Sequence, residues 1–204
     1  MKHLKIAGLA ALAVTAMMAS AGAGTAAAEL YSGATTRGVG SEISATLKSG
    51  TSTLFKDGNG LSMDTCTGSE AVGKLATTGG ASTIISMRGF SFTGCSHATS
   101  VLPEFVVTGG YFQYGELTVT HIPGTTNGTV SARGLEITIK STVFGTSCIL
   151  DTGIGTTIGT LTGTSSGNAT LDINATVSMG FCGTATWTGT YVITKPVPLG
   201  VEAS

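Results

Sequence analysis

One short run in the sequence has the pattern of a serine hydrolase: Gly163-Thr164-Ser165-Ser166-Gly167. It fits G-x-S-x-G, in which a turn between a strand and a helix presents the serine as a nucleophile. In that arrangement the acid and the histidine follow the serine along the chain, but no histidine lies beyond residue 121. The residues that follow, 168–179, favour a strand. We therefore interpret residues 163–167 as a hairpin turn and keep a secreted hydrolase as an alternative function.

The remaining groups that could do acid–base chemistry are scattered along the chain. His97 lies in a polar loop and His121 ends a predicted strand before Pro123-Gly124, so we expect both to lie beside turns. A Ser–His–Asp arrangement in another chain order stays open, because such triads occur on unrelated folds. A glycosidase needs two facing carboxyl groups, and the sequence does not show which carboxylates face one another. The candidates are Asp64, Glu70, Glu104, Glu116 and Glu136. We predict no catalytic residues.

Two patterns that could bind a metal are incomplete. Asp57-Gly58-Asn59-Gly60 begins like a calcium loop, but Leu61 stands where a fifth-position oxygen ligand belongs. This run predicts a hairpin turn instead. The cysteines contain no Cys-x-x-Cys or Cys-x-x-His pair of the kind that binds zinc. We therefore predict no metal and no cofactor.

The four cysteines predict two disulfides, as expected for an even number in an exported protein. They are Cys66, Cys95, Cys148 and Cys182. Two parts of the chain follow the same order of cysteine, strand, Gly-rich turn, strand and cysteine, although chance similarity in a Thr- and Gly-rich chain is the alternative. If the repetition is real, Cys66 pairs with Cys95 and Cys148 with Cys182.

An aromatic cluster is the main candidate for binding. Tyr111, Phe112 and Tyr114 lie between glycines at 109–110 and 115. Exposed tyrosine rings bury a large area at low entropic cost, so such a loop could bind a glycan or a protein. The alternative is that the phenylalanine is part of the core and the tyrosines border it.

The composition predicts the elements that position these residues. The chain has 204 residues, of which 31 are Gly, 36 are Thr and only 10% are charged. Outside the N-terminus, short alternating runs broken by Gly, Asn and Asp favour strands at regular spacing. We therefore predict an all-β fold, a single disulfide-stapled β-sandwich of the jelly-roll kind. The ten basic residues form no patch for nucleic acid.

The first 28 residues predict a secretory signal peptide. Lys2, His3 and Lys5 form a basic start, residues 6–18 are apolar, and three alanines end at Ala28. The apolar stretch is shorter than the ~20 residues that span a bilayer. We predict a secreted domain over residues 29–204, with no transmembrane segment in the mature chain.

The start of that domain is a candidate for strand exchange. In the segment Glu29–Gly40, Leu30 and Tyr31 are followed by small, uncharged residues from Ser32 to Thr36. Such a chain end is often frayed. The alternative is that it adds as a strand to a sheet edge, either its own or that of a second copy.

Several of these features together resemble a known family. The Ala-rich leader, the four cysteines, Phe92-Thr93-Gly94-Cys95 and Thr186-Trp187-Thr188-Gly189 are similar to small secreted bacterial all-β proteins of the PraB type, activators of alkane oxidation. The resemblance covers about residues 66–191. It implies a non-enzymatic β-sandwich at the cell surface or in the matrix, and it implies no functional residues.

The sequence thus favours a secreted, non-enzymatic surface or extracellular-matrix protein that acts through protein contacts, with self-assembly as one form of action. The first alternative is a small glycan- or protein-binding module, and the second is the hydrolase. An enzyme would need a pocket with convergent titratable groups. A binding module would need an exposed aromatic face, and a matrix protein would need an unpaired sheet edge or a self-complementary patch.

Overall fold

Over the residues that the structure describes, the protein is all-β, with 17 strands and one short 3-10 turn. The computed structural model describes residues 28–97, 99–102, 105–107, 111–113, 115–140 and 147–203, without the side chains of 99–102, 105–107 and 111–113. No helix in these ranges has the length and hydropathy needed to span a bilayer. The elements are β1 Ala28–Ser32, β2 Thr35–Thr36, β3 Glu42–Leu47, β4 Thr53–Asp57, β5 Ser62–Thr77, β6 Thr83–Cys95, β7 Thr99–Leu102, β8 Phe105–Val107, β9 Tyr111–Gln113, β10 Glu116–His121, β11 Gly128–Arg133, β12 Glu136–Lys140, β13 Ser147–Asp151, β14 Thr156–Thr162, β15 Thr170–Ser178, η1 Gly180–Cys182, β16 Thr184–Lys195 and β17 Gly200–Ala203.

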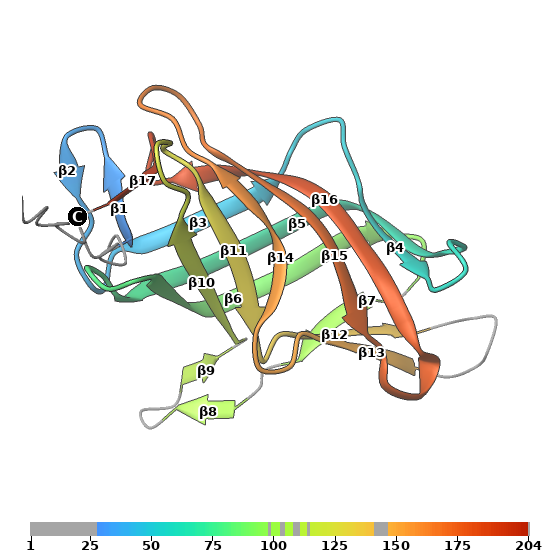
Figure 1. The fold of residues 1–204 in the computed structure, drawn as a ribbon. Helices are drawn as coiled ribbons and strands as arrows, with labels where there is room; N and C mark the ends of the chain where they lie inside the picture. Colours follow the sequence, from blue (N-terminus) through green and yellow to red (C-terminus); the bar gives the residue numbers. More distant parts are fainter. Residues whose placement is uncertain are drawn as a thin grey trace, which may run out of the picture.

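The main sheet closes on itself into an eight-stranded antiparallel barrel (Figure 1). Seven places in the ring are taken by β5, β6, β10, β11, β14, β15 and β16 in chain order. The eighth place is shared by β3 and β4, both of which pair with β16 on one side and with β5 on the other. The ring is therefore an up-and-down meander closed by the last long strand.

Closure corrects part of the prediction from sequence. The all-β class and the disulfides are confirmed, but the architecture is a barrel and not the predicted jelly-roll β-sandwich. Alternation of apolar and polar residues shows that one face of each strand is buried, and both architectures satisfy that condition. What decides between them is the pairing of β16 with β3 and β4, which lie about 130 to 150 residues earlier in the chain.

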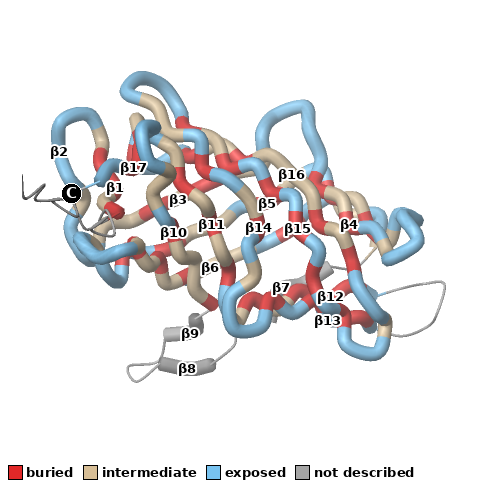
Figure 2. Tube along the Cα trace, viewed as in Figure 1, coloured by how far each residue is buried: buried red, intermediate tan, exposed pale blue. Residues whose placement is uncertain are grey.

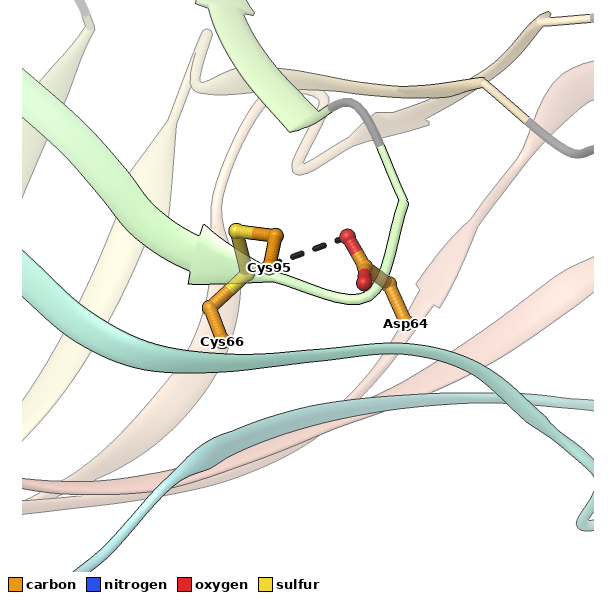
Figure 3. Close-up of side chains that lie close together, drawn as sticks. All are labelled: Asp64, Cys66 and Cys95. Carbon is orange, nitrogen blue, oxygen red and sulfur yellow. Dashed lines mark hydrogen bonds between the residues drawn. A yellow bond between two sulfur atoms is a disulfide. The ribbon is translucent and has the colours of Figure 1, made fainter.

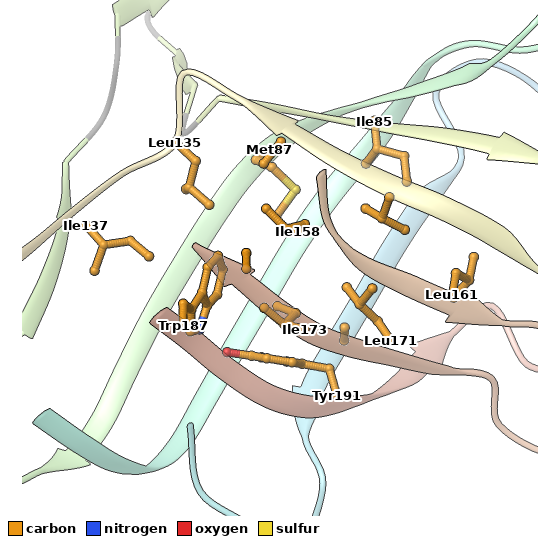
Figure 4. Packing of buried hydrophobic residues seen from close by; sticks show 14 of the residues in the cluster. Ile85, Met87, Leu135, Ile137, Ile158, Leu161, Leu171, Ile173, Trp187 and Tyr191 are labelled. Carbon is orange, nitrogen blue, oxygen red and sulfur yellow. The ribbon is translucent and has the colours of Figure 1, made fainter. Parts of the chain in front are cut away.

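Alternation along each strand separates an apolar interior from a polar outside. In β15, Leu171, Ile173, Ala175 and Val177 are buried, and every residue between them is exposed. Figure 2 shows the same change from buried to exposed along the neighbouring barrel strands. The inner side chains, including Ile85, Met87, Ile158, Leu161, Trp187 and Tyr191, form one cluster (Figure 4). The interior is thus a hydrophobic core and not a channel.

The aromatic residues of this core keep their polar atoms bonded. Trp187 is 1% exposed, and its ring stacks on Phe55 at 6.0 Å between centroids. Its Nε1–H donates to Thr53 Oγ1 at 3.0 Å, and the Tyr191 hydroxyl donates to Ser69 Oγ at 3.0 Å. A buried polar atom without a partner costs free energy. The hydroxyls of Thr53 and Ser69 therefore stabilise the burial of the two aromatic side chains.

One end of the barrel is covered by the two chain ends of the folded domain. Strand β1 pairs with β17 and with β2, and Leu30 and Val201 are fully buried there. Gly200 lies opposite Tyr31, whose ring occupies the place that a side chain at 200 would need. Ala28, the last residue of the predicted signal peptide, is also buried, and its N–H donates to Gly80 O at 2.6 Å. The rest of that segment, residues 1–27, lies outside the described residues.

A second, smaller ribbon extends the sheet beyond the ring. Strand β13 contacts β15 through Asp151 and Ser178, and it pairs along its length with β12. Strand β12 in turn pairs with β7. The inward side chains of this ribbon, Ile137, Ile139 and Leu150, belong to the same core cluster. The ribbon lies below the barrel in Figure 1, beside the ends of β14 and β15.

Truncation of a buried side chain in β1 tests whether this strand is part of the core. We expect Leu30→Ala to lower the free energy of unfolding by about 2–5 kcal/mol, because a fully buried leucine leaves a cavity when truncated. Denaturant unfolding followed by circular dichroism measures the change. Val39→Ala is the matched control, because Val39 lies in the same N-terminal region but is 66% exposed. Equal effects of the two variants would contradict the role of β1 in the core.

Tyr191 predicts a loss of stability at alkaline pH. Burial raises the pKa of Tyr191 to about 12 from the ordinary value of 10.0. Between these two values the unfolded chain loses the phenolic proton and the folded chain keeps it, so stability falls as pH rises, by about 2–3 kcal/mol in total. Below pH 10 this residue contributes no pH dependence.

Denaturant titrations from pH 8 to pH 12 test this prediction with Tyr191→Phe, which removes the ionising group. We expect the variant to be less stable at pH 8, because the hydrogen bond to Ser69 is lost. Its stability should then fall less steeply above pH 10 than that of the wild type. The same slope in both proteins would show that Tyr191 does not carry the effect.

Candidate functional site

The two disulfides join the cysteines that the sequence paired. Cys66 of β5 is bonded to Cys95, directly opposite it on β6, and Cys148 of β13 is bonded to Cys182 of η1. The first bond ties two neighbouring barrel strands, and the second ties the small ribbon to the turn between β15 and β16. The first bond also lies close to the ribbon along the chain, since β7 begins four residues after Cys95.

A buried carboxylate lies beside the first disulfide (Figure 3). Asp64 is fully buried, and its Oδ1 accepts hydrogen bonds from Thr65 N at 2.8 Å, Ser96 Oγ at 2.7 Å and His97 N at 2.9 Å. We call Asp64, Ser96 and His97 the Asp64 clasp. These bonds fix the chain where it leaves β6, because two of the three donors belong to residues 96–97.

The Asp64 clasp contains the residue types of a catalytic triad but not its geometry. In a triad the imidazole lies between the acid and the serine and uses a different nitrogen for each. Here the Ser96 hydroxyl donates directly to Asp64, and both the Asp64 carboxylate, at 3.7 Å, and Ser96 Oγ, at 3.3 Å, face Nδ1 of His97. The ring therefore gives no path for a proton between serine and acid.

The same place does not offer the ligands of a metal. Asp64, Cys66 and Cys95 have potential ligand atoms within 4.8 Å of one another. Both sulfur atoms are used in the disulfide, however, and a metal is bound by thiolates. The contact between Asp64 Oδ2 and Cys66 Sγ, at 3.7 Å, is a packing contact, because a disulfide sulfur carries no hydrogen.

The structure does not bring the other predicted catalytic candidates together. Ser165 is exposed in the loop between β14 and β15, as the hairpin interpretation of residues 163–167 predicted. His121 ends β10, and its Nε2 lies 2.8 Å from Thr125 O in the next turn. Of the scattered carboxylates, Asp64 is in the clasp, Glu70 is exposed on β5, and Glu116 and Glu136 lie on β10 and β12. Glu104 lies outside the described residues.

The predicted binding residues are only partly within the described structure. Tyr111 and Phe112 lie in β9, which pairs with β8 in a separate two-stranded sheet. Their side chains, and the whole of Tyr114, lie outside what the structure describes. Leu30 and Tyr31, the candidates for strand exchange, are buried in β1, which is paired on both sides within its own chain.

A groove on the outer wall of the barrel is a concave site lined by polar side chains. Its volume is about 380 Å³, within the range of about 300–1,000 Å³ found for small-molecule sites. We call it the threonine groove; it is lined by Lys56, Asp57, Gly58, Gly60, Thr176, Thr184, Thr186 and Thr188. These residues come from β4, β15, β16 and the turn between β4 and β5.

Sheet register explains how the threonine groove is built. Lys56, Thr186 and Thr176 lie side by side across β4, β16 and β15. Thr184 and Thr188 extend the same outward row along β16, because alternate residues of a strand share a face. The turn after β4 rises against this row: a side-chain carbon at Gly58 would lie 3.2 Å from Thr184 Oγ1. That turn therefore forms one wall of the groove.

The wall is held by the side chain and backbone of one aspartate. Asp57 Oδ1 accepts hydrogen bonds from Asn59 N and Leu61 N, each at 2.9 Å. The backbone N–H of Asp57 donates to Leu61 O at 2.9 Å, and Gly60 N–H donates to Asp57 O at 2.9 Å. The run Asp57-Gly58-Asn59-Gly60 thus forms a hydrogen-bonded hairpin turn, as the sequence predicted.

Sequence reasoning missed both the groove and the Asp64 clasp. A signal for the groove was present, because residues 184–190 read Thr-Ala-Thr-Trp-Thr-Gly-Thr and so place four threonines on one face of a strand. No signal for the clasp was available, since Asp64 meets Ser96 and His97 only when β5 and β6 pair.

The barrel interior offers little room for a ligand. The cavity among its side chains has a volume of about 60 Å³. Its lining is almost entirely apolar, with Leu30, Met87, Ile158 and Leu199 among the residues. A space of this size and polarity is a packing defect of the core, since ligand sites are several times larger.

Comparison with known proteins identified no relative. No protein-family model, curated protein or solved structure matches the chain.

The Asp64 clasp predicts a large effect of one substitution on stability. We expect Asp64→Ala to lower the free energy of unfolding by about 3 kcal/mol or more, because it removes the carboxylate acceptor of the His97 N–H and the Ser96 hydroxyl, and the nearer of two acceptors of the Thr65 N–H. Asp151→Ala is the control, because the Asp151 carboxylate also accepts a backbone N–H, from Gly153, but is exposed. Denaturant unfolding measures both, and similar small losses would contradict a structural role for the clasp.

Proposed function

We propose that the chain is a secreted, non-enzymatic protein of the bacterial cell surface or extracellular matrix, acting through contacts made by the outside of its barrel. The observation that carries the proposal is the contrast between the interior of the barrel and its outer surface. The interior is filled, with a residual cavity of about 60 Å³. Any partner of ordinary size must therefore meet the outer surface.

The chemistry of the outer surface supports contact with a partner. The outward residues of β10, β11, β14, β15 and β16 are rich in threonine and poor in charge, as the composition requires. Large apolar side chains are also exposed at turns: Leu61 is 67% exposed, Ile154 97% and Phe181 81%. Exposed apolar groups of this kind contribute to protein contacts when a partner covers them.

The disulfides support an oxidising location. Structural disulfides persist outside the cytosol and are rare within it. Both bonds lie at the junction between the barrel and the small ribbon, where each closes a loop of about 30 residues. Such a loop stabilises the folded chain by about 3–4 kcal/mol in the chain-entropy model, which suits a protein that works unprotected outside the cell. The resemblance to PraB-type proteins agrees with this proposal.

Self-assembly by strand exchange is a narrower form of the proposal. Strand β1 is already paired with β17 and β2 of its own chain. Exchange between copies therefore requires β1 to leave its place and occupy the same place in a neighbour, as in domain swapping. Leu30 and Tyr31 would then fill the same buried positions in the second copy.

Fractionation of the producing cell tests the proposed location. We expect the protein in the medium or on the outer surface, without its first 28 residues and with no free thiol. An antibody against the purified barrel detects the protein in each fraction, and mass spectrometry gives the N-terminus and the state of the cysteines. Full-length, reduced protein confined to the cytosol would overturn the proposal.

Size-exclusion chromatography with electron microscopy of the same secreted protein tests the narrower form. Oligomers or filaments are expected if β1 exchanges between copies. A protein that is monomeric at all concentrations would eliminate strand exchange and leave contact with another partner.

A further inference from the structure

We propose that the threonine groove binds a short neutral saccharide. This inference rests on the proposed function, because it names the class of partner that a contact protein of this kind would meet. The groove is built of hydroxyl groups on rigid strands, has a volume of about 380 Å³, and lies open on the outer wall.

The hydrogen-bonding groups of the groove match those of a sugar. Each threonine hydroxyl can donate one hydrogen bond and accept others, as can each hydroxyl of a saccharide. Thr184 and Thr176 are exposed, while Thr186 and Thr188 are half-buried and form the floor. Because threonine side chains are stiff at χ1, this row of hydroxyls loses little freedom when a ligand binds.

The charge of the groove favours a neutral ligand. Lys56 and Asp57 are neighbours in the chain and both line the groove, so a cation and an anion offset one another there. An anionic ligand would meet the Asp57 carboxylate, and a cationic ligand would meet the Lys56 ammonium. A hydroxyl-rich ligand without charge can accept hydrogen bonds from the ammonium and donate them to the carboxylate.

The shape of the groove depends on a residue without a side chain. A side-chain carbon at Gly58 would lie 3.2 Å from Thr184 Oγ1, at the edge of the groove where the turn approaches β16. Gly58 therefore leaves room at the point where the turn meets β16. On this reading, Gly58→Ala narrows the groove without changing its polar groups.

Nuclear magnetic resonance of the labelled mature protein tests the inference. The probes are cellobiose, mannobiose, lactose and chitobiose at millimolar concentrations, with inorganic phosphate and a neutral tetrapeptide for comparison. We expect at least one saccharide to shift the backbone amide signals of residues 57–60, 176 and 184–188, with saturation. Neither phosphate nor the peptide should do so.

The variants locate the binding. Thr184→Val combined with Thr186→Val keeps the β-branched shape and removes two hydroxyls, so we expect the affinity for the binding saccharide to fall about tenfold or more. The matched control is Thr129→Val combined with Thr160→Val, a cross-strand pair of outward threonines on β11 and β14 outside the groove. Gly58→Ala is the second variant, should the double variant fail to fold, and it is expected to weaken binding as well.

Several results would overturn the inference. These are the absence of groove shifts with every saccharide, shifts with phosphate or the peptide alone, and equal affinities of the groove variants and the control pair. They would leave the proposed surface function standing if fractionation finds the protein outside the cell. Conversely, saccharide binding by a protein found only in the cytosol would support the groove and refute the location.

Discussion

Closure of the sheet by β16 is the constraint on which the rest of the structure depends. On one side β16 pairs with nine residues of β15, and on the other it meets both β3 and β4. It also contributes Trp187 and Tyr191, the two largest fully buried side chains. Because closure leaves no unpaired edge among the barrel strands, the chain needs few charged residues to protect them, in keeping with its charged fraction of 10%.

Closure of the sheet also places the apolar side chains inside the barrel and the polar side chains on its outer surface. Apolar residues at alternate positions fill the inside, so the outside is left to threonine, serine and a few charges. The short strands β3 and β4 share one place in the ring, and the turn after β4 therefore stands against the outer row of β16. The groove is thus a consequence of how the ring closes, while the Asp64 clasp is a consequence of how β5 and β6 pair.

Local features of the fold could be predicted because local interactions decide them. The strand expected over residues 168–179 is observed as β15, and the hairpin turns expected at residues 57–60 and 163–167 lie between strands. Strand β6 runs through Gly89, where its register against β5 changes.

The sequence by itself determined the all-β class and the hairpin turns, because each depends on neighbouring residues, and a short internal repeat favoured the cysteine pairing that the structure shows. Only the tertiary structure decided that the sheet forms a barrel, and it also assembled the Asp64 clasp and the threonine groove. Alternation of apolar and polar residues with a period of two shows that one face of a strand is buried, but it does not show which strand lies beside it. Asp57 and Ala185 are neighbours across a sheet and 128 residues apart in the chain, and a pairing of that range is set by the free energy of the whole core.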